Sequence, residues 1–128
     1  MSLRVELVVP DRELWSGQAS TVIAKTLEGD IGVLTGHSPV FGVLTEGSVA
    51  EIVTDEVRIR AAVSGGFLSV ADDRVSILAA QAELAGEVNI EQTRAELAAA
   101  LAEAAPGTED SPAVKYARAR LRAAGSQD

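Results

Sequence analysis

Few residues of this 128-residue chain are suited to acid–base or nucleophilic chemistry. The chain contains no cysteine and a single histidine, His37. The lack of cysteine excludes disulfides, thiolate zinc sites and cysteine nucleophiles. A serine–histidine–aspartate hydrolase would have to be centred on His37, and no spacing around this residue supports such a triad. We therefore predict that His37 is a turn or interface residue and that the chain has no catalytic or metal site.

A glycine-rich run, Gly29-Asp30-Ile31-Gly32-Val33-Leu34, is followed by His37-Ser38-Pro39. Glycine-rich loops bind phosphate when they lead into a helix or a lysine, and neither follows here. The run is predicted to be a turn-rich stretch in which Gly29, Gly32 and Gly36 permit positive φ angles. Exposed loops on a rigid scaffold often carry function, so a role in protein contact stays open.

Basic residues gather near the C-terminus, although the chain as a whole has a net charge of -8. Lys115, Arg118 and Arg122 are spaced so that they share one side of a predicted helix. Two interpretations stay open: solubility with a favourable charge at the helix C-terminus, or docking to an acidic protein surface. The acidic net charge argues against binding to nucleic acid or to anionic lipid.

Residues up to about Ala80 are predicted to form strands. Apolar and polar residues alternate over residues 3–7, and β-rich segments follow at 20–26, 40–44, 49–53, 57–61, 67–70 and 75–78. Short strands separated by turn residues, such as Asp72-Asp73, are typical of an all-β sandwich. Aromatic residues make up only 3% of the chain, so the core should be aliphatic. Gly65-Gly66 is predicted to be a strand-entry bend or bulge.

The pattern changes to a helical one after Ala85-Gly86. Asn89 is a suitable N-cap for a helix over residues 90–105, with Gln92 in the position of a capping-box partner. Ser111-Pro112 starts a second helix. The predicted fold class is therefore α+β: an all-β sandwich at residues 1–85 and an antiparallel αα-hairpin at 86–128. Helices this short are marginal alone, so they need the sandwich or a partner.

Together these segments resemble the epsilon subunit family of bacterial F-type ATP synthases over nearly the whole chain. The motifs that carry the resemblance are Val8-Val9-Pro10 with Trp15-Ser16-Gly17, the run from Gly29 to Leu34 with His37-Ser38-Pro39, Gly65-Gly66-Phe67-Leu68-Ser69-Val70, and Val75-Ser76-Ile77-Leu78-Ala79. The resemblance implies a sandwich of about ten strands and a C-terminal helical hairpin. Both agree with the elements predicted from the residues.

The resemblance also implies a non-catalytic subunit of the central stalk, which couples the gamma subunit to the rotor ring of c subunits. It implies a peripheral protein on the cytoplasmic face of the bacterial cell membrane, without direct membrane insertion and without a required cofactor. In the family the loop that matches Gly29, Asp30, Ile31 and Gly32 faces the ring. His37 would lie near that contact or near the gamma contact.

The hairpin of this family restrains ATP hydrolysis during proton-driven synthesis when it extends toward the alpha/beta catalytic head. By resemblance, Lys115, Arg118 and Arg122 would then meet acidic residues of the beta subunit. Some members bind regulatory ATP through an Ile/Leu-Asp-x-x-Arg-Ala motif. Ile90-Glu91-Gln92-Thr93-Arg94-Ala95 resembles it, with Glu91 in place of aspartate.

Two other function classes remain as alternatives. One is a stand-alone β-sandwich module that binds a small ligand tightly without any partner protein. The other is a hydrolase centred on His37, which would lose its turnover in a His37→Ala variant.

Overall fold

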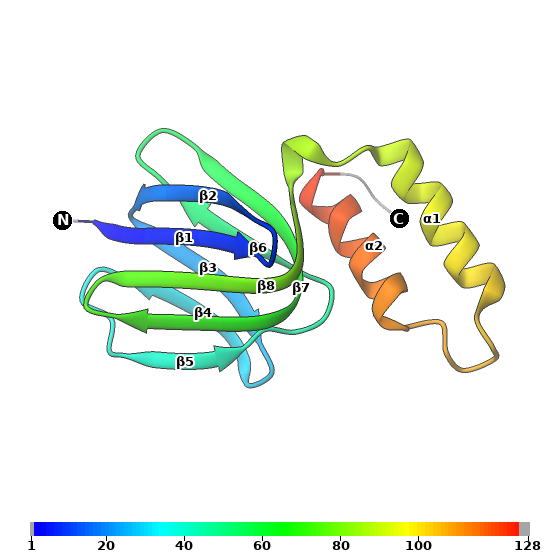
Figure 1. Cartoon of the computed structure of the whole chain (residues 1–128), viewed down its shortest axis with the longest axis horizontal. Helices are drawn as coiled ribbons and strands as arrows, with labels where there is room; N and C mark the ends of the chain where they lie inside the picture. Colours follow the sequence, from blue (N-terminus) through cyan, green and yellow to red (C-terminus); the bar gives the residue numbers. More distant parts are fainter. Residues whose placement is uncertain (1, 126–128) are drawn as a thin grey trace.

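The computed structural model, which describes residues 2–125, is a two-layered β-sandwich with a helical hairpin beside one end (Figure 1). A 3-10 helix, η1 (Ala85–Glu87), connects the sandwich to helices α1 (Ile90–Glu103) and α2 (Pro112–Ala123). This arrangement confirms the predicted fold class. The strands are β1 (Leu3–Val9), β2 (Arg12–Ala19), β3 (Thr21–Thr26), β4 (Gly29–Leu34), β5 (Val40–Val43), β6 (Ser48–Val53), β7 (Arg58–Ala71) and β8 (Arg74–Leu84).

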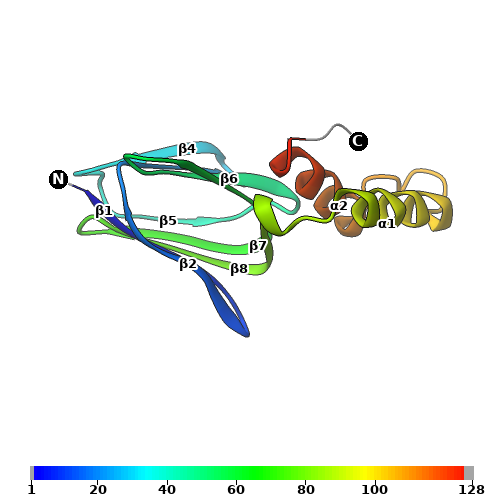
Figure 2. The same ribbon diagram turned by 90° about the horizontal axis from the view of Figure 1, so that it is seen from above.

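The two layers are joined through one long strand. The hydrogen-bonded order is β2-β1-β8-β7-β6-β3-β4, with β5 also paired to β7. Strand β1 runs parallel to β8, and the other neighbouring pairs are antiparallel. Strand β7 pairs with β6 through residues 58–63 and with β5 through residues 67–70. It therefore passes from one layer to the other, as the view from above makes clear (Figure 2).

Two glycines allow β7 to make this passage. Gly65 and Gly66 have φ angles of 70° and 102°, a region that other residues rarely adopt. A Cβ atom at Gly66 would also overlap the backbone carbonyl of Leu78 on β8. The predicted bend is confirmed, but it lies inside a continuous strand instead of at a strand entry.

Over residues 2–125 the structure has eight strands, where about ten were expected. The predicted segments 57–61 and 67–70 fall in the single strand β7. This strand bends at the two glycines but stays paired with β8 on both sides of the bend. Strand β2 was not predicted, since its polar and apolar residues do not alternate regularly along the sequence RELWSGQA. The stretch from Gly29 is a strand, β4, paired with β3, and not a series of turns. Gly32 lies within this pairing, opposite Ile23.

The core of the sandwich is aliphatic, as predicted. Leu3, Val5 and Leu7 alternate along β1 and have no exposed surface. Their neighbours include Leu68 from β7 and Ile77 from β8, which are also fully buried. Close-packed aliphatic interiors deform little, so the sandwich is a stiff body.

The hairpin has its own small core. Leu97 of α1 packs against Val114 and Leu121 of α2. The side chain of Asn89 accepts a hydrogen bond from the Gln92 backbone nitrogen at 2.9 Å, which confirms the predicted N-cap. The expected capping box is not formed, because the Gln92 side chain points along the helix to Glu96 at 3.5 Å. Within residues 2–125, neither helix has the length and apolarity needed to span a membrane.

Candidate protein-interaction site

The predicted ring-facing residues lie at the start of β4, beside the turn that follows β3. The side chain of Asp30 is 73% exposed and lies 3.8 Å from the ammonium group of Lys25. Gly29 and Gly32 are exposed, and no atom beyond their chain neighbours would come within 4 Å of an added Cβ. Ile31 is half-buried against the core. This edge of the sandwich is therefore open to a partner.

His37 lies in the loop beyond the opposite end of β4. The five steps between its six residues, at about 3.3 Å each, separate the two ends of the strand by about 16 Å, so His37 is not close to Asp30. Its Nδ1 atom lies 2.7 Å from the carbonyl oxygen of Ser38. The Gly36 backbone nitrogen, next to it, donates a 2.7 Å hydrogen bond to Asp73 of the β7–β8 turn. The structure thus places the predicted interface residues in two separate regions.

An exposed apolar patch, which the sequence reasoning missed, adjoins the start of β4. Val43 of β5 is opposite Phe67 of β7, and Phe67 is opposite Leu78 of β8. The Phe41 and Phe67 rings stack with centroids 5.1 Å apart. Leu27 joins the patch because its backbone nitrogen donates to the Val43 carbonyl at 2.9 Å. We call this set the apolar patch: Leu27, Phe41, Val43, Phe67 and Leu78.

The side chains of the apolar patch are more exposed than large apolar residues usually are. Leu27 is 71% exposed, Phe41 63% and Phe67 45%. Contiguous apolar surface of this kind on a protein surface marks an interaction site. A cavity of about 210 Å³ is lined by both Phe41 and Asp30, so the patch and the exposed edge of β4 form one continuous surface.

A signal for the patch was present in the sequence. Residues 40–44 are apolar on both faces of the strand, broken only by Gly42, and Phe67 precedes the buried Leu68. A strand that is covered on one face only should alternate. Apolar residues on the outer face therefore indicate a second contact surface.

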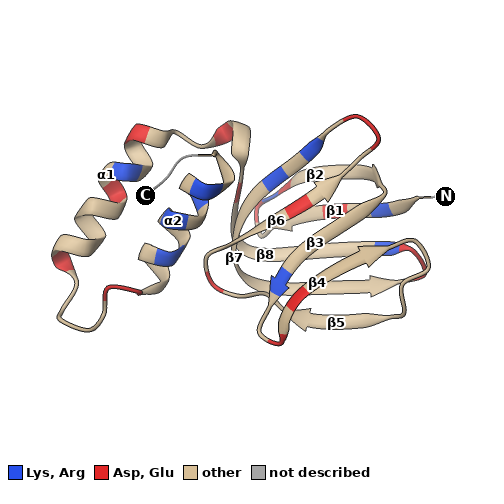
Figure 3. Cartoon of the chain, turned by 180° about the vertical axis from the view of Figure 1, so that it is seen from behind, with Lys and Arg blue, Asp and Glu red and all other residues tan. Residues whose placement is uncertain are grey.

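The predicted basic residues lie on α2, which runs between α1 and the sandwich (Figure 3). Lys115 is exposed, and its backbone lies against Gly47 in the loop between β5 and β6. Arg118 is half-buried. Arg122 donates a 3.3 Å hydrogen bond from Nη2 to the Gly47 carbonyl. In this conformation α2 therefore faces the sandwich, with Arg122 bonded to it.

The motif that resembles the ATP-binding sequence forms the first turns of α1. Ile90 packs against the hairpin core, whereas Glu91 and Arg94 are exposed. In the part of the chain that the structure describes, no cluster of three or more acidic, histidine or cysteine side chains has the arrangement of a metal site.

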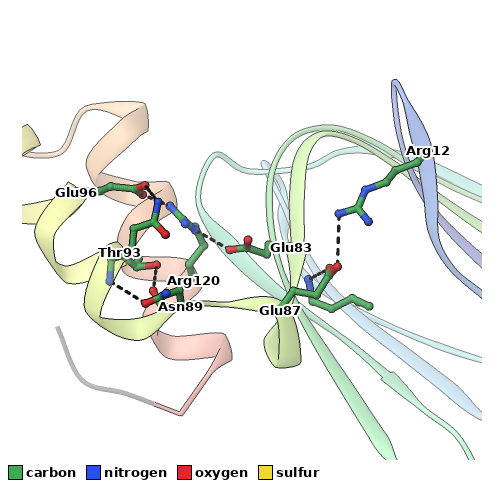
Figure 4. A network of polar contacts seen from close by, with 9 residues as sticks. Arg12, Glu83, Glu87, Asn89, Thr93, Glu96 and Arg120 are labelled. Atoms are coloured by element: carbon green, nitrogen blue, oxygen red, sulfur yellow. Dashed lines mark hydrogen bonds and ion pairs between the residues drawn. The ribbon is translucent and has the colours of Figure 1, made fainter.

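Arg120 was not predicted to be important, yet it connects three elements (Figure 4). Its Nε donates to Glu83 of β8 at 2.9 Å and its Nη1 to Glu96 of α1 at 2.5 Å. Its guanidinium also lies over the Tyr116 ring, 5.4 Å from the centroid. Burial lowers the pKa of Arg120, but the hydrogen bonds to Glu96 and Glu83 outweigh this effect and raise it above its usual value.

Tyr116 lies at the contact between α2 and the sandwich, packed beside Ala62 of β7. Burial raises the pKa of Tyr116 to about 12, because its charged form loses hydration. The Glu83 carboxylate contributes to this raised pKa, and the Arg120 charge opposes it. Glu87 and Glu96 add smaller effects in the raising direction.

Comparison with known proteins shows which family this chain belongs to. The family described as "ATP synthase, Delta/Epsilon chain, beta-sandwich domain" matches residues 2–85. The ATP synthase epsilon chain of Thermobifida fusca is 50% identical over 129 residues, which cover 98% of this chain and 94% of that protein. The chain belongs to the ATP synthase epsilon chain family. The epsilon chain of Streptomyces avermitilis is 46% identical over 125 residues, covering 98% of this chain and 97% of the relative.

Solved structures agree with this family at the level of the fold. A chain of the Euglena gracilis mitochondrial ATP synthase superposes with a TM-score of 0.71 at 23% identity, covering 94% of this chain and 75% of that chain. A chain of the Tetrahymena thermophila mitochondrial central stalk superposes with a TM-score of 0.59 at 19% identity, covering 97% of this chain and 91% of that chain. Members of the epsilon family are subunits of the synthase and are not themselves catalytic, as we expected for this chain.

Proposed function

We propose that this chain couples the gamma subunit to the ring of c subunits in the central stalk of an F-type ATP synthase. The observation that carries the proposal is the apolar patch, which lies on the stiff sandwich of a chain from the epsilon family. The patch seats the gamma subunit, and the edge at Gly29 and Asp30 contacts the ring. In this role the chain is a peripheral protein at the cytoplasmic face of the bacterial membrane.

The mechanical part of this role follows from the sandwich. A subunit held between two rotating partners must transmit torque without deforming. Strands β7 and β8 run through much of the sandwich as one antiparallel pair, from Ala61 opposite Leu84 to Ala71 opposite Arg74. Together with the close-packed aliphatic core, this pair resists shear between the layers.

The regulatory part of the proposal concerns the hairpin. When it leaves the sandwich and extends toward the alpha/beta head, Lys115, Arg118 and Arg122 meet acidic residues of the beta subunit and restrain ATP hydrolysis. Regulatory ATP at Ile90, Glu91 and Arg94 would favour one hairpin position over the other. A ligand shifts such an equilibrium only through its different affinity for the two states.

The experiment is affinity purification of the tagged chain from membranes of the native organism. We expect recovery together with the alpha, beta and gamma subunits, and loss of these partners with Phe67→Asp, which places a charge in the apolar patch. A matched Glu56→Ala variant, at the tip of the β6–β7 turn, should keep them. Recovery of the folded wild-type chain without gamma would contradict the proposal. Tight binding of a small ligand by the isolated chain would favour the stand-alone module instead.

Regulation is tested on the same complex. ATP hydrolysis should rise when the chain ends at Ala85, because the hairpin that restrains the head is then missing. Equal hydrolysis by the full and shortened complexes would exclude a restraining hairpin. It would leave the coupling role of the sandwich untouched.

A further inference from the structure

The helical hairpin touches the sandwich mainly through α2, and the apolar residues at this contact are small. Ala119 and Ala123 of α2 lie on Ala62 of β7, with Val49 of β6 partly buried beside them. An alanine side chain buries little apolar area, so each such contact contributes little hydrophobic stabilisation. The contact is therefore weaker than one built from leucines, and individual specific interactions decide whether it forms.

The first of these interactions is the close contact between α2 and Gly47. Gly47 has a φ angle of 67°, and its backbone nitrogen donates a hydrogen bond to the Ser64 hydroxyl at 3.2 Å. A Cβ atom at this position would overlap the backbone carbonyl group of Lys115 on α2. Only glycine therefore lets the helix approach this closely, and Arg122 bonds to the Gly47 carbonyl at the same place.

The second interaction is the pair of hydrogen bonds made by Arg120. Its side chain is 15% exposed and holds Glu83 of the sandwich and Glu96 of α1 at the same time. Hydrogen bonds between such charged groups are about twice as strong as neutral ones. Removing the guanidinium would leave two carboxylates near each other without their shared cation. One residue thus ties α1, α2 and β8 together.

We propose that Gly47 and Arg120 form a latch that holds the helical hairpin against the sandwich. Because Leu97, Val114 and Leu121 give the hairpin a core of its own, opening the latch releases both helices as one unit. The latch is a property of the isolated chain and does not depend on the synthase. One consequence does rest on the proposed function: Arg122 cannot meet an acidic partner until it leaves Gly47.

The test uses the full isolated chain, which carries two natural probes. Its single tyrosine, Tyr116, lies at the latch, and its single tryptophan, Trp15, packs against the sandwich core. Alkaline titration of the phenol reports docking, and tryptophan fluorescence reports the integrity of the sandwich. Hydrogen exchange of α2 amides gives an independent measure. The absence of cysteine also allows clean spin labelling at one site in each unit.

Gly47→Ala is compared with Gly36→Ala. Gly36 has a φ angle of 86° and nothing within 4 Å of an added Cβ, so the control carries similar backbone strain without touching the hairpin. Arg120→Gln is compared with Arg58→Gln, which removes an exposed arginine paired with Glu51 in the sandwich. The overpacking introduced by Gly47→Ala changes the docking equilibrium by a factor of about ten or more.

Both latch variants should speed exchange of the α2 amides by about tenfold or more, Gly47→Ala through overpacking and Arg120→Gln through the loss of charged hydrogen bonds, and the pKa of Tyr116 should fall toward its ordinary value of 10. The spin-label distance should broaden, while Trp15 fluorescence and both controls stay as in the wild type. Should Gly47→Ala disturb the sandwich itself, Arg120→Gln decides alone, because Arg120 lies outside the sandwich. Unchanged exchange of the α2 amides in Arg120→Gln, with a Tyr116 pKa that does not fall, would overturn the latch, and so would the same result in a folded Gly47→Ala.

Discussion

Phe67 and Leu68 are neighbours on β7 that point to opposite faces, and replacing each by alanine should separate binding from stability. Leu68 is fully buried, whereas Phe67 is 45% exposed in the apolar patch. Leu68→Ala should lower the free energy of unfolding by about 2–5 kcal/mol, because it removes transfer energy and leaves a cavity. Phe67→Ala should cost only about 1 kcal/mol, mainly the lost stacking on Phe41.

The effect on binding should be reversed. A phenylalanine side chain has about 200 Å² of surface, so the exposed part of Phe67 is about 90 Å². If the gamma subunit covers it, the lost burial is worth about 2 kcal/mol at 25 cal/mol per Å². Phe67→Ala should then weaken gamma binding by about 30-fold. The Leu68→Ala variant should bind gamma with the affinity of the wild type at temperatures at which it stays folded.

Calorimetric titration of the purified gamma subunit into each variant measures the binding, and urea unfolding measures the stability. Phe67→Ala with the affinity of the wild type would refute the assignment of the patch to gamma. A stability loss larger for Phe67 than for Leu68 would refute the register of β7 itself.

Three further outcomes are expected. Leu121→Ala should loosen the hairpin core by about 2–5 kcal/mol, seen as faster hydrogen exchange in both helices with an unchanged melting temperature of the sandwich. Gly66→Ala should destabilise the sandwich strongly in thermal melts, because its Cβ overlaps the Leu78 carbonyl, whereas Gly32→Ala should be nearly neutral because its surroundings are open. Hairpin docking should weaken as the pH rises from 10 through 12: the docked state raises the pKa of Tyr116 above 10, so it favours the neutral phenol, and loss of the proton favours release. Hydrogen exchange or spin-label distances measured across this pH range would detect the release. The charged groups that face this phenol are Glu83, Glu87, Glu96 and Arg120.

Much of the fold was predictable from local patterns. The alternation of Leu3, Val5 and Leu7 placed β1, and Asn89 and Ser111 marked the two helix starts, because these signals act over a few residues. The merging of two predicted strands into β7 was not predictable. It depends on whether Gly65-Gly66 ends a strand or bends it, and the pairing with β8 on both sides of the bend decides that.

The interaction surface was predicted only in part. The motif at Gly29 and Asp30 drew attention to the exposed edge of β4, but Phe41, which lines the same cavity as Asp30, comes beside this edge only through folding. Arg120 was missed for a similar reason. Its partners Glu83 and Glu96 lie 37 and 24 positions earlier in the chain, and helical spacing alone placed Arg120 off the side that carries Lys115 and Arg122.

Site-directed cross-linking within the assembled synthase tests whether the apolar patch contacts the gamma subunit. Because the chain has no cysteine, a single Phe41→Cys substitution can carry a photoreactive group at the apolar patch, and Arg58→Cys can carry it on the other layer of the sandwich. We expect an adduct with the gamma subunit from Phe41 and none with gamma from Arg58. An adduct with gamma from Arg58 only, or none from Phe41 in an intact complex, would contradict the contact between the patch and gamma.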